Sequence, residues 1–172
     1  MAGDPGIGPH IPPSISASAP SADTGDNHDP GCSIAATLGV IGDRWTVLIL
    51  RDVFRGVHRF GELQQDLGIA RNLLADRLAK LVEAGVLDKV VYQERPLRHE
   101  YRLTAKGADL SPALIALMRW GDRWYADGSP PTVLVHEACG TPLEQTVRCP
   151  QCGEAVQPGR IRSRPGPGRS HP

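Results

Sequence analysis

The residues with the most distinctive metal-binding chemistry lie near the C-terminal end of the chain. Two residues separate Cys149 from Cys152, and two also separate His136 from Cys139. Nine residues lie between the two pairs. This spacing lets both donors of a pair face one ion, and the glycine after each pair tolerates an unusual backbone angle. Three cysteines and one histidine supply the tetrahedral donor set of a closed structural zinc site. We therefore expect a zinc-ribbon-like segment over residues 129–156, with no open position for a catalytic water.

The same residues permit other chemistry. Cys149 and Cys152 also fit a disulfide or a thioredoxin-like redox pair, although no βαβ unit of the kind that usually carries such a pair is predicted. A rubredoxin-like iron site would use the same ligands, so colour and metal content would separate an electron carrier or enzyme from structural zinc. Because the segment has few apolar residues, metal binding worth about 10–16 kcal/mol is the expected source of its stability.

A second group of chemically useful residues follows a tight turn at Gly68, in a helical pattern over residues 71–84. Apolar residues recur on one side of this helix, and a polar face is predicted opposite them. The predicted DNA-contacting residues are Arg71, Asn72, Asp76, Arg77 and Lys80. Arginine recognises guanine through two hydrogen bonds and asparagine recognises adenine in the same way, while a carboxylate can accept from cytosine. An ordinary solvated face, with Asp76 paired to Lys80, explains the same pattern.

The next segment predicts a β-hairpin with basic residues near its tip. Residues 86–93 and 98–103 read as strands around a Glu-Arg-Pro turn. We expect Arg95 and Arg98 to contact the DNA backbone. Residues 32–128 hold fourteen Lys plus Arg and twelve Asp plus Glu, so binding must depend on the placement of charge and not on its total.

The helices that must position these residues are readable from the pattern of apolar residues and glycines. The expected helices cover residues 32–42, 43–56, 60–68, 71–84 and 104–125, the last restarting at Ser111-Pro112. The two end segments hold 18 of the 35 Gly and Pro residues, so residues 1–31 and the basic stretch 157–172 are expected to be disordered tails. The basic tail would serve either non-specific DNA attraction or solubility.

The composition also excludes several classes of protein. The net charge is zero, which excludes a chain that is basic throughout. No signal-peptide pattern or apolar run long enough to span a bilayer is present, so we expect a cytoplasmic protein without a membrane partner. We find no phosphate-binding loop, nucleophile motif or pair of catalytic carboxylates, and we expect no enzymatic activity.

Three separated motifs carry a resemblance to a known family. IGDRWTVLILRD at 41–52, RFGELQQDLGIARNLLADRL at 59–78 and RPLRHEYRLTAKG at 95–107 resemble the HxlR-type winged helix-turn-helix transcription regulators. The resemblance covers about 95 residues and departs from the family at Ala70, where many members have a serine cap. It implies a homodimeric bacterial regulator whose first and last helices form the dimer contact. It also implies that residues 71–84 enter the major groove and that residues 86–103 lie along the backbone.

Cys32 lies just before the first predicted helix. A helix N-terminus favours the thiolate and so raises reactivity. Some HxlR-like regulators have a cysteine in this region whose oxidation changes DNA affinity, which makes Cys32 a candidate redox sensor. A small apolar side chain packed under the helix is the alternative interpretation.

The expected architecture is therefore mainly α with a β-hairpin wing, as a winged helix-turn-helix domain over residues 32–128 followed by the zinc-ribbon-like segment. The expected function is a DNA-binding regulator, more often a repressor, that binds a pseudo-palindromic operator as a homodimer. A thiol oxidant or a small-molecule effector would be its signal. The alternatives are a protein-interaction module, which would lack competitor-resistant DNA binding, and a metal or redox protein built on the cysteine cluster.

Overall fold

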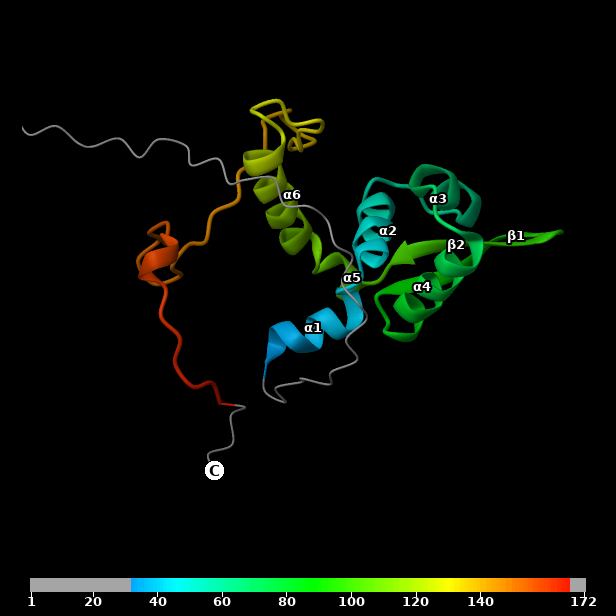
Figure 1. Ribbon diagram of the computed structural model, residues 1–172, viewed down its shortest axis with the longest axis horizontal. Helices are drawn as coiled ribbons and strands as arrows, with labels where there is room; N and C mark the ends of the chain where they lie inside the picture. Colours follow the sequence, from blue (N-terminus) through cyan, green and yellow to red (C-terminus); the bar gives the residue numbers. More distant parts are fainter. Residues whose placement is uncertain (1–31, 168–172) are drawn as a thin grey trace, which may run out of the picture.

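The computed structural model describes residues 32–167. The predicted N-terminal tail, 1–31, and the end of the predicted basic tail, 168–172, lie outside the described residues. The elements follow one another as α1 Ser33–Ile41, α2 Arg44–Phe54, α3 Phe60–Leu67, α4 Arg71–Glu83, β1 Leu87–Glu94, β2 Leu97–Leu103, α5 Ala105–Ala108, α6 Ser111–Tyr125 and the short 3-10 turn η1 Pro158–Arg160 (Figure 1). The predicted helices and the hairpin are thus confirmed, with boundaries shifted by one or two residues.

Local signals explain where the helices start and stop. The Asp43 carboxylate accepts hydrogen bonds from the backbone N–H groups of Trp45 and Thr46, at 3.0 and 3.2 Å, and so caps α2. Gly68 ends α3 in the left-handed conformation and turns the chain toward α4. The helix-turn-helix therefore comprises α3 and α4 joined by Gly68, Ile69 and Ala70.

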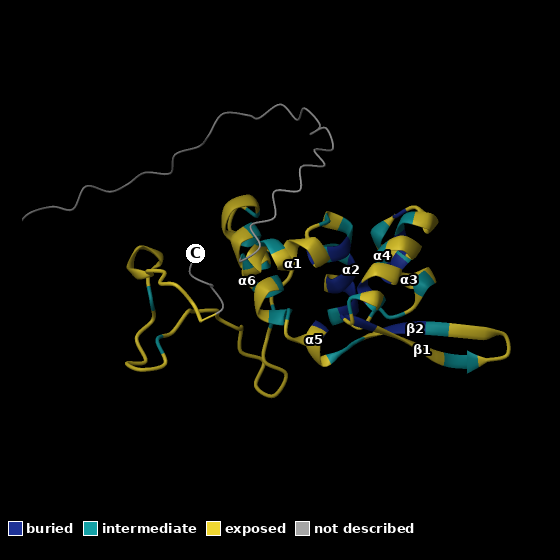
Figure 2. Ribbon diagram, turned by 90° about the horizontal axis from the view of Figure 1, so that it is seen from below, coloured by how far each residue is buried: buried dark blue, intermediate teal, exposed yellow. Residues whose placement is uncertain are grey.

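The core is formed by α2, α3, α4 and the base of the hairpin (Figure 2). Its fully buried side chains are mainly branched aliphatic residues, which include Ile49, Leu50, Leu63, Leu74, Leu78, Leu81 and Leu87. The apolar positions predicted for α4 are the ones that pack here. The opposite side of α4 is consequently left facing solvent.

The two strands form an antiparallel hairpin that projects from this core (Figure 2). Leu87 pairs with Leu103 at its base, and Glu94 pairs with Leu97 at its tip, with a register shift between Val91 and Gln93. The Tyr101 N–H donates to the His58 carbonyl at 2.8 Å. The backbones of Arg59 and Glu100 form an isolated antiparallel β-bridge. These contacts attach the hairpin to the start of α3.

The last helical stretch differs in detail from its prediction. Thr104 caps the short α5 by accepting from the Gly107 N–H at 3.0 Å, and a new helix, α6, then begins. Ser111 was predicted to cap this helix, but it is already helical and the cap is Leu110, with Pro112 in the first turn. Pro112 fits there because the first N–H groups of a helix have no partner within it.

Residues 129–156, predicted to be a zinc-ribbon-like segment, are not folded into one unit in the structure. They hold two tight turns, closed by the isolated bridges Val135–Pro142 and Arg148–Ala155, which lie well apart (Figure 1). No side chain of this segment is buried, because its few apolar residues cannot build a core that joins the turns (Figure 2).

Within residues 32–167, no single helix is long and apolar enough to cross a membrane. The neighbouring helices α1 and α2 meet that requirement in length and composition only when taken together, with a bend of 79° between them.

Candidate functional site

The exposed face of α4 carries most of the residues predicted to contact DNA. Arg71, Asn72, Asp76 and Lys80 are all exposed, and Ala75 and Ala79 lie between them. This face is opposite the buried leucines of the same helix, as the periodicity predicted. The small side chains on it leave room for the polar ones to approach a partner.

Arg77 differs from these residues because it is engaged within the protein. Its Nε donates to Asp43 Oδ1 at 2.9 Å, and its side chain is only 22% exposed. Burial raises the pKa of the Asp43 carboxyl, but the hydrogen bond from Arg77, those from the Thr46 and Trp45 N–H groups and the Arg77 charge outweigh it, so the pKa lies below its usual value. Arg77 therefore fixes α4 against the start of α2.

The negative charge of Asp76 is balanced by two cations. Arg77 Nη1 lies 2.7 Å from Asp76 Oδ2, and Lys80 Nζ lies 3.2 Å from the same oxygen. The predicted pairing of Asp76 with Lys80 is present in this arrangement. A carboxylate at this position thus does not make the α4 face acidic.

The N-terminus of α4 is held without the usual side-chain cap. Ala70 occupies the cap position and makes no side-chain hydrogen bond, as the departure from the family's serine implied. The Arg71 guanidinium instead lies over the Phe60 ring, 5.3 Å from its centre. This cation–π contact links the first residue of α4 to the first residue of α3.

The hairpin places Arg95 and Arg98 at its exposed tip. Among the residues that the structure describes, no carboxylate forms an ion pair with either of them, whereas Arg102 is paired with Glu100 at 2.6 Å. Arg59 was not singled out by the sequence analysis. It lies over the Tyr92 ring of the hairpin at 4.6 Å and 3.4 Å from Glu62, and its position directly before α3 was the available signal.

We expect Asp43→Ala to lower the free energy of unfolding by about 1–2 kcal/mol, because it removes the α2 cap and the partner of Arg77. Since the pKa of Asp43 is lowered by folding, its contribution is full above the unfolded pKa and is lost as the pH falls through the folded pKa. In urea unfolding, the difference in the free energy of unfolding between parent and variant should therefore be largest near pH 7 and should decrease below about pH 4. Asp43→Asn, which keeps a capping oxygen, is the control and should lie between them. If the difference in the free energy of unfolding is as large in acid as at pH 7, the ionised Asp43 carboxylate is not the source of the stabilisation.

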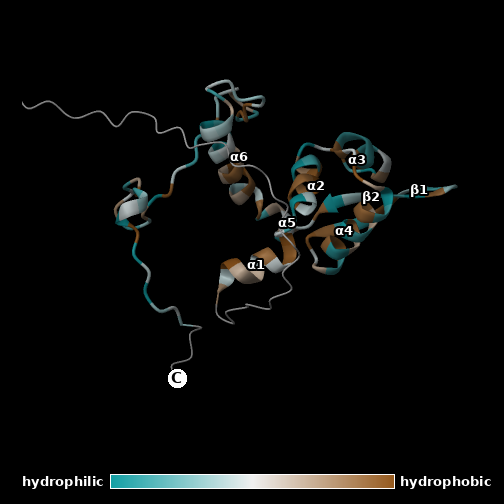
Figure 3. Cartoon of the chain, viewed as in Figure 1, coloured by the Kyte–Doolittle hydropathy of each residue, from teal (hydrophilic) through white to brown (hydrophobic). Residues whose placement is uncertain are grey.

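Helices α1 and α6 carry large apolar side chains that are exposed in the single chain, and Figure 3 shows apolar residues along α1 and in the first part of α6. Ile34 and Leu38 of α1 are 71% and 56% exposed. On α6, Leu117, Trp120 and Trp124 are exposed to a similar degree, and no residue of this helix is buried. We refer to these five residues as the α1–α6 face. Exposed apolar surface of this extent is typical of an interaction site.

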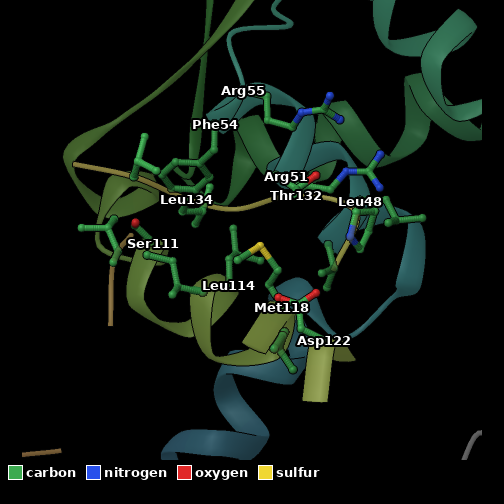
Figure 4. Close-up of a pocket in the computed structure, with 16 residues that line it drawn as sticks. Leu48, Arg51, Phe54, Arg55, Ser111, Leu114, Met118, Asp122, Thr132 and Leu134 are labelled. Atoms are coloured by element: carbon green, nitrogen blue, oxygen red, sulfur yellow. The ribbon is translucent and has the colours of Figure 1, made fainter. Parts of the chain in front are cut away.

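A cavity of about 560 Å³ lies between α2, α6 and the first of the two C-terminal turns. Leu114 and Met118 line it from α6, and Arg51 and Arg55 lie on the α2 side (Figure 4). Leu134 and Leu143 close it from the turn. The cavity therefore has an apolar body, with the Asp122 carboxylate also in its lining. Arg51 and Arg55 are both paired with the buried Asp52, at 2.8 and 3.5 Å.

The four predicted metal ligands form two separate pairs. His136 Nδ1 lies 3.2 Å from Cys139 Sγ, and the hydrogen bonds from Thr141 lower the pKa of the Cys139 thiol. The backbone N–H groups of Cys152 and Gln151 lower the pKa of Cys149. No group of three or more potential metal ligands assembles anywhere in residues 32–167, so the structure does not bring the two pairs together.

Cys32 lies at the N-terminal end of α1, where it is half-buried and forms no disulfide bond. Its carbonyl accepts from the Ala36 N–H at 3.0 Å. The predicted sensor is thus next to the α1–α6 face and distant in sequence from the C-terminal cysteines.

This arrangement defines a winged helix-turn-helix protein, with α3 and α4 as the two helices of the motif and β1 and β2 as the wing. The model of the HxlR-like helix-turn-helix family matches residues 40–129, and the chain belongs to this family. It is a transcription regulator of the helix-turn-helix class.

The relatives agree with this assignment. The chain is 45% identical to the uncharacterized HTH-type transcriptional regulator Rv3095 of Mycobacterium tuberculosis, over 80% of this chain and 88% of the relative. An uncharacterized HTH-type regulator of Synechocystis, sll1512, is 36% identical over 57% of this chain and 73% of its own length. The crystal structure of PA1607, described as a candidate transcription factor, superposes with a TM-score of 0.72 at 40% identity, covering 79% of this chain and 96% of that one. The relatives named here are regulators and not enzymes.

Proposed function

We propose that the protein is a sequence-specific DNA-binding repressor that acts as a homodimer in the cytoplasm. The observation that carries the proposal is the polar face of α4, which is exposed beside a basic hairpin on a winged helix-turn-helix fold. In this fold class, the second helix of the motif enters the major groove. A repressor bound over a promoter excludes polymerase.

The dimer would use the α1–α6 face. A two-fold pair doubles the number of phosphate contacts and reads two half-sites about 34–36 Å apart. The exposed tryptophans and aliphatic residues of α1 and α6 support this choice, because burying them in a dimer removes apolar surface from water.

The contacts divide between bases and phosphates. Arg71 and Asn72 lie in the first turn of α4, the part of a recognition helix that meets base edges, and are assigned to bases. Lys80, Arg95 and Arg98 are assigned to the backbone. Arg77, engaged with Asp43, is assigned to positioning α4, and Asp76 to keeping Arg77 and Lys80 in place.

Footprinting of the full chain on the DNA that surrounds its own gene tests the proposal. We expect a protected, pseudo-palindromic site that resists excess non-specific competitor at moderate salt. Binding to all DNA alike, or to none, would instead favour the alternative of a protein-interaction module.

The assignment of Lys80 predicts a specific change in salt dependence. Lys80→Ala should weaken binding to every sequence alike and reduce the salt slope by about two ions per dimer, one for each Lys80. Asn72→Ala should leave the slope unchanged and blur the preference at one base pair. Fluorescence anisotropy over a series of salt concentrations measures both effects, with Lys80→Arg as the charge-conserving control. An unchanged slope for Lys80→Ala would reject the phosphate contact.

For the signal, we propose oxidation of Cys32. The support is its position at the start of α1 and the likeness to the structure titled "Redox regulator HypR in its oxidized form", with a TM-score of 0.50 at 30% identity over 54% of this chain and 96% of that one. Cys32→Ser should bind DNA as the parent does but lose the response to a thiol oxidant. Both proteins should be compared with their C-terminal cysteines replaced. If the oxidant then changes DNA binding equally in the parent and in Cys32→Ser, Cys32 is not the sensor.

The cavity between α2 and α6 supports a second proposed signal, the binding of a small, largely apolar molecule that packs on Leu114, Met118 and Leu134. Met118→Trp, which fills the cavity, should abolish its calorimetric binding signal without changing the operator affinity of the ligand-free protein. A binding signal retained in this variant would place the effector elsewhere.

A further inference from the structure

The two C-terminal turns are the same structure repeated thirteen residues apart. In the first turn, Leu143 N–H donates to Leu134 O, His136 N–H to Thr141 O and Gly140 N–H to His136 O. In the second, the same three hydrogen bonds join Val156 to Val147, Cys149 to Glu154 and Gly153 to Cys149, with all six distances between 2.7 and 2.9 Å. His136 and Cys139 therefore occupy the positions that Cys149 and Cys152 occupy in the other turn.

Both turns have the backbone that brings two donors onto one side. Gly140 and Gly153 follow the second donor of each pair with φ of 68° and 72°, a conformation that side chains other than glycine rarely adopt. His136 Nδ1 and Cys139 Sγ are 3.2 Å apart. A tetrahedral zinc ion with ordinary Zn–N and Zn–S bond lengths requires about 3.6 Å between such donors, so a small side-chain adjustment brings this pair to ligand spacing.

No buried core accounts for the shape of this segment. Residues 129–167 contain no buried side chain, and Val133, Val135 and Val147 are each about half exposed or more. The two turns share the same backbone hydrogen bonds, and one presents an imidazole and a thiol while the other presents two thiols. Each pair is half of the donor set that one zinc ion requires. The alignment with the mycobacterial relative covers 80% of the chain and so must extend past residue 128 into this segment.

The chain between the two donor pairs is long enough for the two turns to approach each other and share one ion. Nine residues separate Cys139 from Cys149, and they span at most about 30 Å when extended, so the same linker fits the separated pairs and a shared ion. The first turn is already attached to α6. Arg119 donates to the Leu143 carbonyl, and Gln145 Nε2 donates to the Pro112 carbonyl at 2.7 Å. Closure would therefore bring the second turn to the first, beside the α2–α6 cavity.

We propose that His136 Nδ1, Cys139, Cys149 and Cys152 of one chain hold a single structural zinc ion. Any cysteine that is protonated beforehand releases its thiol proton to solvent as its sulfur binds. The four ligands fill the tetrahedral shell and leave no position for a reacting water. The site is independent of the DNA-binding face, because none of its residues lies on α4 or the hairpin.

The test uses the full chain, measured for metal content as purified and then, after removal of metal, titrated with Co²⁺. We expect one zinc per chain, and a cobalt spectrum with tetrahedral bands and thiolate-to-metal charge transfer that zinc displaces. Cys139→Ser and Cys152→Ser should each reduce the zinc content to background, whereas Cys32→Ser, outside the site, should retain one zinc. His136→Cys should keep the tetrahedral spectrum with stronger charge transfer.

Circular dichroism of each variant shows whether the helical domain remains folded, so that loss of metal is not mistaken for loss of fold. Several outcomes would overturn the proposal. These are iron in the purified protein, zinc content that does not depend on Cys139, and half a zinc per chain, which would mean that two copies share the ligands. Since operator binding is measured separately, failure of the zinc site would leave the proposed DNA-binding function untouched.

Discussion

A variant with Leu117→Asp and Trp120→Asp should be a monomer and should bind its operator on the order of 100-fold more weakly than the parent. Both side chains lie on the α1–α6 face and are more than half exposed in the single chain. In a dimer they would be buried, so two carboxylates there would lose their hydration without gaining a partner. The affinity falls because each half-site must then be bound without help from the other.

Analytical ultracentrifugation and operator anisotropy measure the two effects on the same samples. Ile161→Asp is the matched control, because Ile161 is 59% exposed but lies outside α1 and α6. It should leave both the mass and the affinity unchanged. A double variant that remains dimeric, or one that is monomeric with full operator affinity, would reject the dimer model.

Those features of the fold that depend on neighbours in sequence were predictable. Asp43 begins α2 because its carboxylate reaches N–H groups two and three residues away, and Gly68 ends α3 because the chain turns there. The leucine spacing of α4 determined which side would be buried. The spacing of residues does not reveal what these helices and the hairpin do. Their role in DNA binding was inferred from the family resemblance.

Features that depend on distant residues were not predictable from the pattern. The pairing of Arg77 with Asp43, 34 residues earlier in the chain, was not predicted, because only the packing of α2 against α4 brings the two side chains together. Arg59 was overlooked because its partner ring, Tyr92, belongs to the hairpin. The four residues proposed as zinc ligands were selected by their spacing, but their separation into two turns follows from the lack of apolar residues around them.

The second large effect is expected at the start of α4. Arg71→Ala should weaken operator binding by about 1–3 kcal/mol for each half-site, which corresponds to roughly 5- to 150-fold each, and should relax the preference at one base pair of each half-site. Arg71 is exposed, and no ion pair to a carboxylate restrains it within the described residues. Its guanidinium lies 5.3 Å from the centre of the Phe60 ring, which orients the side chain before DNA binds.

Two further variants separate the charge of Arg71 from its geometry. Arg71→Lys keeps the positive charge but loses the planar fork that grips guanine, so it should restore affinity for all DNA without restoring specificity. Phe60→Leu keeps Arg71 and removes the ring, so it should give a smaller loss at the same base pair. Competition binding against single-base variants of the operator distinguishes these results. If Arg71→Lys restores both affinity and specificity, Arg71 acts as a phosphate contact, and base recognition must then depend on Asn72.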